Sequence, residues 1–163
     1  MLTAADLKFY QSTNNLGGSP NFTTEVNPSE NGFWDLISGE ESSSGDVEYR
    51  CLYVRNISTT NDLLTPSIEL IQDSADPDTS INIAVLDNVN ETTAVSPNES
   101  TEPAGSPTWY GAGVDIPFNA SLAFDAGGNG DFIAIWVRRT VANTNNLTAN
   151  NSCIYSLKGQ TSS

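Results

Sequence analysis

The sequence predicts an all-β protein, namely an Ig-like or jelly-roll-like antiparallel β-sandwich with an extended N-terminal arm. Short segments alternate between apolar and polar residues, and clusters of Gly, Pro and Asn separate them. Asn, Ser and Thr account for 53 of the 163 residues, and these types favour turns over helices. No segment places apolar residues at helical spacing over three turns. We expect one domain, with the arm over residues 1–46 and the sandwich over residues 47–163.

The clearest strand lies in residues 45–58, GDVEYRCLYVRNIS, where side chains alternate regularly from Glu48 to Arg55. Its aromatic and β-branched residues favour extended structure. Further strands are expected at 6–10, 67–73, 81–87, 131–141 and 153–159.

The segment DFIAIWVRRTV, residues 131–141, is apolar on both faces up to Val137. This pattern indicates a central strand, with Trp136 buried at the middle of the sandwich. Arg138 and Arg139 follow at its end. We expect them to emerge into solvent and to pair with a carboxylate of the same molecule.

Residues 11–46 and 88–118 differ from the rest because Gly, Pro and Ser interrupt their apolar residues. The first region is typical of an extended arm, which can follow a neighbour's surface and fill pockets with its apolar side chains. The second is a long connection. Tryptophan is enriched in binding hot spots, although an arm or a tryptophan could equally cover its own domain. The candidate partner-binding residues are Leu7, Phe9, Phe22, Phe33, Trp34 and Trp109.

Twenty acidic residues against six basic ones give a formal net charge of −14. Proteins that grip phosphate groups need clustered Lys and Arg, so we expect no nucleic-acid partner. No apolar run approaches the roughly 18 residues of a membrane-spanning helix, and the N-terminus lacks the features of a signal peptide. The seven Asn-x-Ser/Thr motifs are attributed to composition.

Cys51 and Cys153 are too few for a disulfide framework. Each lies in an alternating apolar segment, which favours buried, reduced thiols, with a disulfide between them as the alternative.

The chain contains no histidine and no recognised catalytic motif. We therefore expect that it is not an enzyme and needs no cofactor. Two acidic or Gly-rich segments, 73–78 and 127–131, resemble calcium loops incompletely, and we interpret both as turns.

Three segments resemble a known class of proteins: DLKFYQSTNNLGG at the start, GDVEYRCLYVRN, and IAIWVRRTV. With the acidic, helix-poor composition, they look like small β-sandwich structural proteins from the virions of tailed bacteriophages. The resemblance implies no catalytic residues. It implies partners such as the major capsid protein or other virion proteins, and a homo-oligomer within the particle.

The resemblance and the residue patterns both indicate an interaction protein. Our first expectation is a capsid decoration, or cement, protein that binds and stabilises neighbouring capsid subunits and is made in the cytoplasm of the bacterial host. The alternatives are a tail or head–tail connector component and a carbohydrate-binding module.

Overall fold

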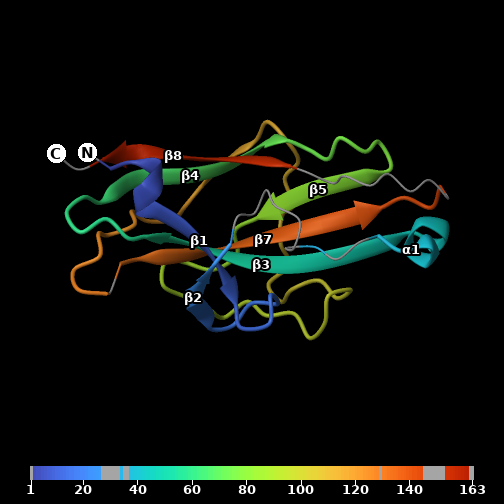
Figure 1. Cartoon of the computed structure of the whole chain (residues 1–163), viewed down its shortest axis with the longest axis horizontal. Coiled ribbons are helices and arrows are strands. Elements are labelled where there is room, and N and C mark those ends of the chain that lie inside the picture. Colours follow the sequence, from blue (N-terminus) through green and yellow to red (C-terminus); the bar gives the residue numbers. More distant parts are fainter. Residues whose placement is uncertain (1, 27–33, 35–36, 129, 145–152, 162–163) are drawn as a thin grey trace.

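The computed structural model describes residues 2–26, 34, 37–128, 130–144 and 153–161, which form two antiparallel sheets (Figure 1). The larger sheet contains β1 (Leu7–Ser12), β2 (Pro20–Glu25), β3 (Asp46–Asn56), β5 (Thr79–Ala84) and β7 (Phe132–Val141). The smaller sheet contains β4 (Leu63–Gln72), β6 (Asp115–Pro117) and β8 (Ile154–Thr161). The predicted all-β, two-sheet fold is confirmed. The Ig-like or jelly-roll topology stays a prediction.

The larger sheet is built around β3 and β7, the two strands with the strongest sequence signals. Its order is β2-β1-β3-β7-β5, and the register of β3 with β7 runs from Asp46 opposite Val141 to Arg55 opposite Phe132. Because antiparallel partners place paired side chains on the same face, this register decides which residues meet.

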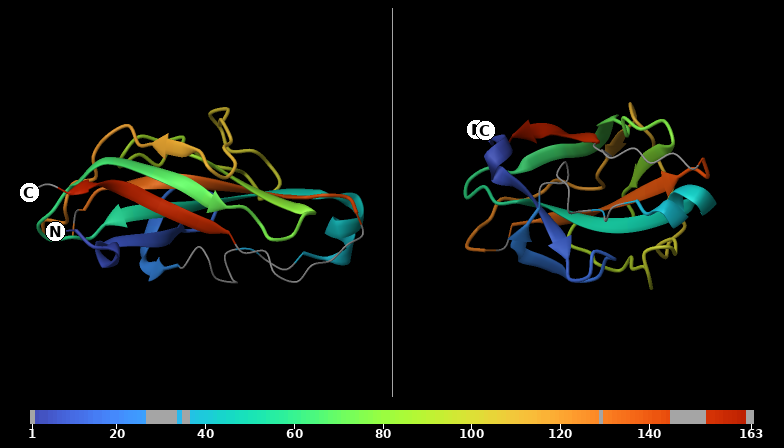
Figure 2. Two further views of the ribbon diagram at one scale, coloured as in Figure 1. Left: turned by 90° about the horizontal axis from the view of Figure 1, so that it is seen from above. Right: turned by 45° about the vertical axis from the view of Figure 1, so that its right-hand side comes forward.

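The two sheets pack face to face, as the right-hand view of Figure 2 shows. One buried cluster, the inner cluster, lies between them. It joins Leu52 and Ile135 of the larger sheet to Ile68 and Leu70 of the smaller one. Its apolar residues recur at every second position along β3 and β7, as expected for a strand face that packs against a core.

A second buried cluster, the outer cluster, lies on the opposite face of the larger sheet and contains Cys51, Tyr53 and Trp136. Trp136 is fully buried, as predicted, but it is not between the sheets. The prediction was wrong on this point because neighbours in a strand point to opposite faces, and Ile135 and Val137 take the inner face.

The outer cluster is covered by two irregular segments, the β1–β2 turn and the long connection between β5 and β6. Gly17, in the turn, pairs with Val95, in the connection. Gly17 has φ of 86°, and a Cβ there would lie 2.3 Å from the carbonyl oxygen of Ala94 and 2.8 Å from the ring of Trp136. Figure 1 shows this connection on the side of the larger sheet away from β4 and β8.

The N-terminal region differs from the expected arm. Residues 7–12 and 20–25 form β1 and β2, and β1 lies inside the sheet between β2 and β3. The arm prediction over residues 1–46 therefore does not hold for these two strands. Leu7 and Phe9 lie two positions apart on one face of the segment and Tyr10 lies on the other, so the segment could bury apolar side chains by joining the sheet.

Further along, a short α-helix, α1 (Gly39–Ser44), is capped at its N-terminal end by Ser38. The Ser38 hydroxyl accepts a hydrogen bond from the backbone N–H of Glu41, and the Glu41 carboxylate accepts one from the backbone N–H of Ser38. This reciprocal capping satisfies two backbone donors that the helix start would otherwise leave unpaired.

Cys51 and Cys153 are both buried and free. They lie in different clusters, Cys51 on the outer face of the larger sheet and Cys153 between the sheets. A disulfide requires Cβ atoms about 4 Å apart, which this separation by a sheet excludes. Among the described residues, no helix has the length and apolar character needed to cross a membrane.

Candidate functional site

Three of the predicted partner-binding residues belong to the protein's own sheet. Leu7 and Phe9 are half-buried on β1 and pack against the inner cluster. Phe22 on β2 makes edge contacts with Tyr10 and Phe132, each with ring centroids 5.3 Å apart. Phe33 lies outside the described residues.

Trp34 lies over two arginines at one end of the sandwich. The guanidinium carbons of Arg50 and Arg139 lie 5.4 and 5.0 Å from the centroid of its ring. Guanidinium groups within about 6 Å of an aromatic face are attracted to it electrostatically. Trp34 is half-buried and packs against the inner cluster. In this structure, Trp34 covers a flank of its own domain.

Trp109 makes the same kind of contact on the outer face. Arg138 lies 5.0 Å from the ring centroid, Tyr49 packs beside it at 5.6 Å, and the indole N–H donates to Glu102 at 2.7 Å. Burial, and then the Glu102 charge, raise the pKa of Tyr49. A ring held in this way is unlike the open aromatic platform on which a sugar could stack.

A buried charged cluster links β3 to β7 beneath Trp34. Glu48 lies opposite Arg139 in the strand register, and their side chains form an ion pair in which each is only 2% exposed. Arg50, two residues along β3 and on the same face, lies 3.5 Å from Glu48 and 2.8 Å from Glu99. The backbone carbonyl of Glu99 also accepts a hydrogen bond from the backbone N–H of Tyr49. This bond fastens the long connection to the part of β3 that is not paired with β1.

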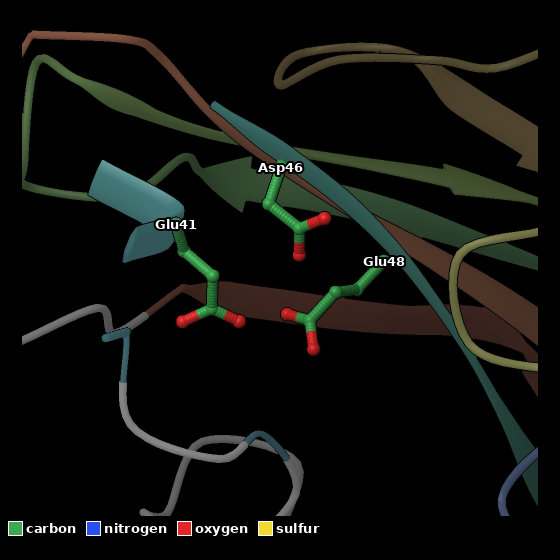
Figure 3. A group of neighbouring side chains, drawn as sticks. All are labelled: Glu41, Asp46 and Glu48. Atoms are coloured by element: carbon green, nitrogen blue, oxygen red, sulfur yellow. The ribbon is translucent and has the colours of Figure 1, made fainter. Parts of the chain in front are cut away.

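Three carboxylates approach one another near this cluster. Figure 3 shows Asp46 and Glu48 projecting from β3 toward Glu41, which comes from α1. One oxygen of each lies within 4.8 Å of the others. Carboxylate oxygens are the type of ligand that Ca²⁺ and Mg²⁺ prefer. Two of the three are already engaged, however, because Glu41 caps α1 and Glu48 pairs with Arg139.

The two segments that resembled calcium loops use their carboxylates to hold turns. Asp73 accepts from the backbone N–H of Ile81 at 2.5 Å, and Asp76 accepts from that of Asp78 at 2.9 Å. Asp131 accepts from the backbone N–H of Ala123 at 2.9 Å, and Asp125, which precedes the second segment, pairs with Arg55 at 3.1 Å. These contacts support the interpretation of both segments as turns, and Asp76 is buried within the first of them.

All six basic side chains of the sequence are engaged within the chain. Lys8 pairs with Glu25, Arg55 with Asp125, and Lys158 with Glu69. Arg50 and Arg139 share Glu48. Arg138 donates to the side-chain oxygen of Asn82 at 2.9 Å and lies over Trp109, so it lacks the predicted carboxylate partner among the described residues.

The sequence singled out the two tryptophans but did not predict the arginines that stack on them. One signal was present: Glu48 and Arg50 alternate with aromatic residues, so they had to share the face of Leu52. A charged pair on that face indicates either a strand end or a buried ion pair, and only the register with β7 distinguishes the two.

Comparisons with protein-family models, with curated proteins and with solved structures found no match to this chain.

Proposed function

We propose that this chain is a structural subunit of a bacteriophage particle, most specifically a capsid decoration protein that binds the major capsid protein and stabilises neighbouring subunits. The proposal rests on the sequence resemblance given above together with one observation of charge. It places the protein in the virion and assigns it no catalytic role.

The observation is that all six basic side chains interact with other groups of the same chain. Each basic side chain is paired or stacked within the fold, and the sequence has twenty acidic residues against these six basic ones. The exterior is therefore negative, and a negative surface repels nucleic acid and keeps a protein dispersed at high local concentration. Such a surface suits a subunit that sits on the outside of a container filled with nucleic acid.

The contacts of the two tryptophans support a non-catalytic role. Trp34 and Trp109 each stack on arginine, and the charged groups near them fasten irregular segments to the larger sheet. Polar and charged side chains in the described part of the chain thus stabilise a rigid scaffold. A rigid scaffold is what a subunit needs if it is to bridge neighbours without deforming.

The experiment is a stoichiometry measurement on purified particles from the phage whose genome encodes the chain. Quantitative gel bands or mass spectrometry should give hundreds of copies per particle for a decoration protein. A copy number of three, six or twelve would indicate a tail or connector part. Absence from particles purified on a density gradient would overturn the virion assignment.

A binding assay separates attachment from co-purification. Purified protein should bind capsids that lack it, and binding should weaken as salt screens the acidic surface if the capsid site is basic. Capsids already carrying the protein are the matched control, because their sites are occupied.

A further inference from the structure

We infer that a small cavity in the connection between β5 and β6 binds a primary alkylammonium ion through the carboxylate of Asp87. The inference concerns the isolated protein and is independent of the proposed virion role. The cavity has a volume of about 220 Å³. Pockets for drug-sized ligands run to roughly 300–1,000 Å³, so this one suits a group the size of a single side chain. Its lining residues are Leu86, Asp87, Thr93, Ala94, Ala104 and Gly105.

Asp87 is a buried carboxylate that only neutral groups contact. It is 6% exposed, and it accepts a hydrogen bond from the Thr93 hydroxyl at 2.5 Å. The backbone N–H of Ala94 donates to its two oxygens at 3.1 and 3.2 Å. In the described part of the chain no basic side chain pairs with Asp87, because the two lysines and four arginines are engaged elsewhere. Burying a charge costs free energy unless an opposite charge accompanies it, so a cation that enters the cavity is stabilised there.

The hydrogen bonds of Asp87 favour an ammonium group over a guanidinium group. Oδ1 accepts from both Thr93 and Ala94, whereas Oδ2 only shares the longer bond from Ala94. The remaining capacity to accept therefore lies mainly on one oxygen. A guanidinium group binds a carboxylate best through two parallel bonds, one to each oxygen. An ammonium group is a compact charge that can donate to a single oxygen.

The walls of the cavity suit the alkyl part of such a ligand. Leu86 and Ala104 contribute apolar side chains, and Gly105 contributes none. A Cβ on Gly105 would lie 3.9 Å from a methyl carbon of Leu86, so the glycine keeps the space beside Leu86 open. Long cationic side chains bury their methylene groups along apolar surfaces in the same way.

The cavity is held in shape before a ligand arrives. The backbone N–H of Ala104 donates to the carbonyl of Val95 at 3.2 Å, and the hydrogen bonds of Asp87 fix Thr93 and Ala94 on the other side. A preformed site loses less conformational entropy when it binds its ligand.

The ammonium group can come from a free alkylamine or from a lysine side chain of a different protein. A second copy of this chain is a poor source, because its two lysines, Lys8 and Lys158, are paired with Glu25 and Glu69. Two molecules of net charge −14 also repel each other. A protein partner would therefore be basic at the surface that presents its lysine.

A titration with n-butylammonium chloride, followed by the backbone amide signals of the ¹⁵N-labelled protein in NMR, tests the inference. We expect saturable shifts at Thr93, Ala94 and Gly105, which line the cavity. The controls are n-butanol, which has the same alkyl chain without the charge, and sodium chloride at equal concentration. Neither control should reproduce the saturable shifts.

Two variants with the same change of charge locate the binding. Asp87→Asn keeps a side-chain oxygen for Thr93 and Ala94 but removes the charge, and it should weaken butylammonium binding about tenfold or more. Asp78→Asn is the matched control, since Asp78 lies in the turn between β4 and β5 and does not line the cavity. It should bind butylammonium as the wild type does.

A lysine with both its α-amino and carboxyl groups blocked distinguishes the two sources. Saturable shifts with this probe would support a protein's lysine as the ligand, whereas saturation by butylammonium alone would support a free amine. The inference is overturned if neither amine gives saturable shifts, if n-butanol or sodium chloride gives the same shifts, or if Asp87→Asn binds with wild-type affinity. Should Asp87→Asn fail to fold, the wild-type comparison of butylammonium with n-butanol and sodium chloride decides the matter.

Discussion

The carboxylate of Glu48 and the guanidinium of Arg139 form an ion pair inside the sandwich, where each side chain is 2% exposed. The pair joins the two central strands at the end of the core where Trp34 covers it. Transferring two charges from water into a protein interior costs free energy. Removing one member of a buried ion pair leaves the charge of the other without that compensation.

Replacing one member of this pair should therefore destabilise the protein strongly. We expect Glu48→Gln to lower the free energy of unfolding by about 3 kcal/mol, because the buried guanidinium of Arg139 then loses its ion pair with the Glu48 carboxylate. Urea titration followed by tryptophan fluorescence measures the change. The double variant Glu48→Gln, Arg139→Met should recover part of the loss, and a double variant as unstable as the sum of the singles would argue against direct coupling.

The packing of Gly17 against Trp136 gives a second prediction. Gly17→Ala should destabilise the fold by about 2–4 kcal/mol, because the new Cβ adds a steric clash to the strain of a left-handed backbone. Gly113→Ala is the control: Gly113 has φ of 84°, close to the 86° of Gly17, but a Cβ on Gly113 would meet no atom within 4 Å. Equal losses of thermal stability in the two variants would show that the crowding at Trp136 contributes nothing.

Local patterns were enough to predict six of the eight strands in the described residues, but not β2, β6 or the contacts between strands. The alternation around Tyr53 and the apolar run before Arg138 predicted β3 and β7 almost to their ends. The same run predicted that Trp136 would be buried, yet not that the β5–β6 connection would bury it. A strand's pattern reports which faces are covered, whereas the covering segment is set by long-range topology.

The candidate site was predictable only in its residue types. Trp34 and Trp109 stood out as large aromatic residues in irregular segments, and the stacked arginines did not, because they lie far away in sequence. The prediction for Arg139 was half right. It pairs with a carboxylate of its own molecule, but it is buried, since its position in β7 shares the inner face with Val137.

Two buried thiols predict an alkaline loss of stability. Burial raises the pKa of both Cys51 and Cys153 above the ordinary value near 9. In the unfolded chain these thiols ionise at about pH 8.5, while in the fold they stay protonated. Their stabilising contribution is therefore full below about pH 8.5 and falls as pH rises toward the folded-state pKa values, by up to about 1.4 kcal/mol per pH unit for each thiol.

Urea titrations at pH 7, 8.5 and 10 measure this dependence. The double variant Cys51→Ala, Cys153→Ala is the control and should flatten the decline between pH 8.5 and 10. Tyr53 and Tyr155, whose pKa values are also raised by desolvation, should retain a loss above about pH 10. A decline that is identical in both proteins would place its origin outside the two cysteines.

The position of β1 predicts how the protein responds to truncation. Deleting residues 1–18 removes β1 and Gly17, and it leaves β2 without the strand that joins it to β3. We expect the truncated chain to lose cooperative thermal unfolding in circular dichroism, because Tyr10 and Phe22 no longer cover the outer cluster. Deleting residues 1–5 keeps β1 whole and should cost little. A chain lacking residues 1–18 that keeps its β-spectrum and nearly full stability would instead support a detachable N-terminal arm.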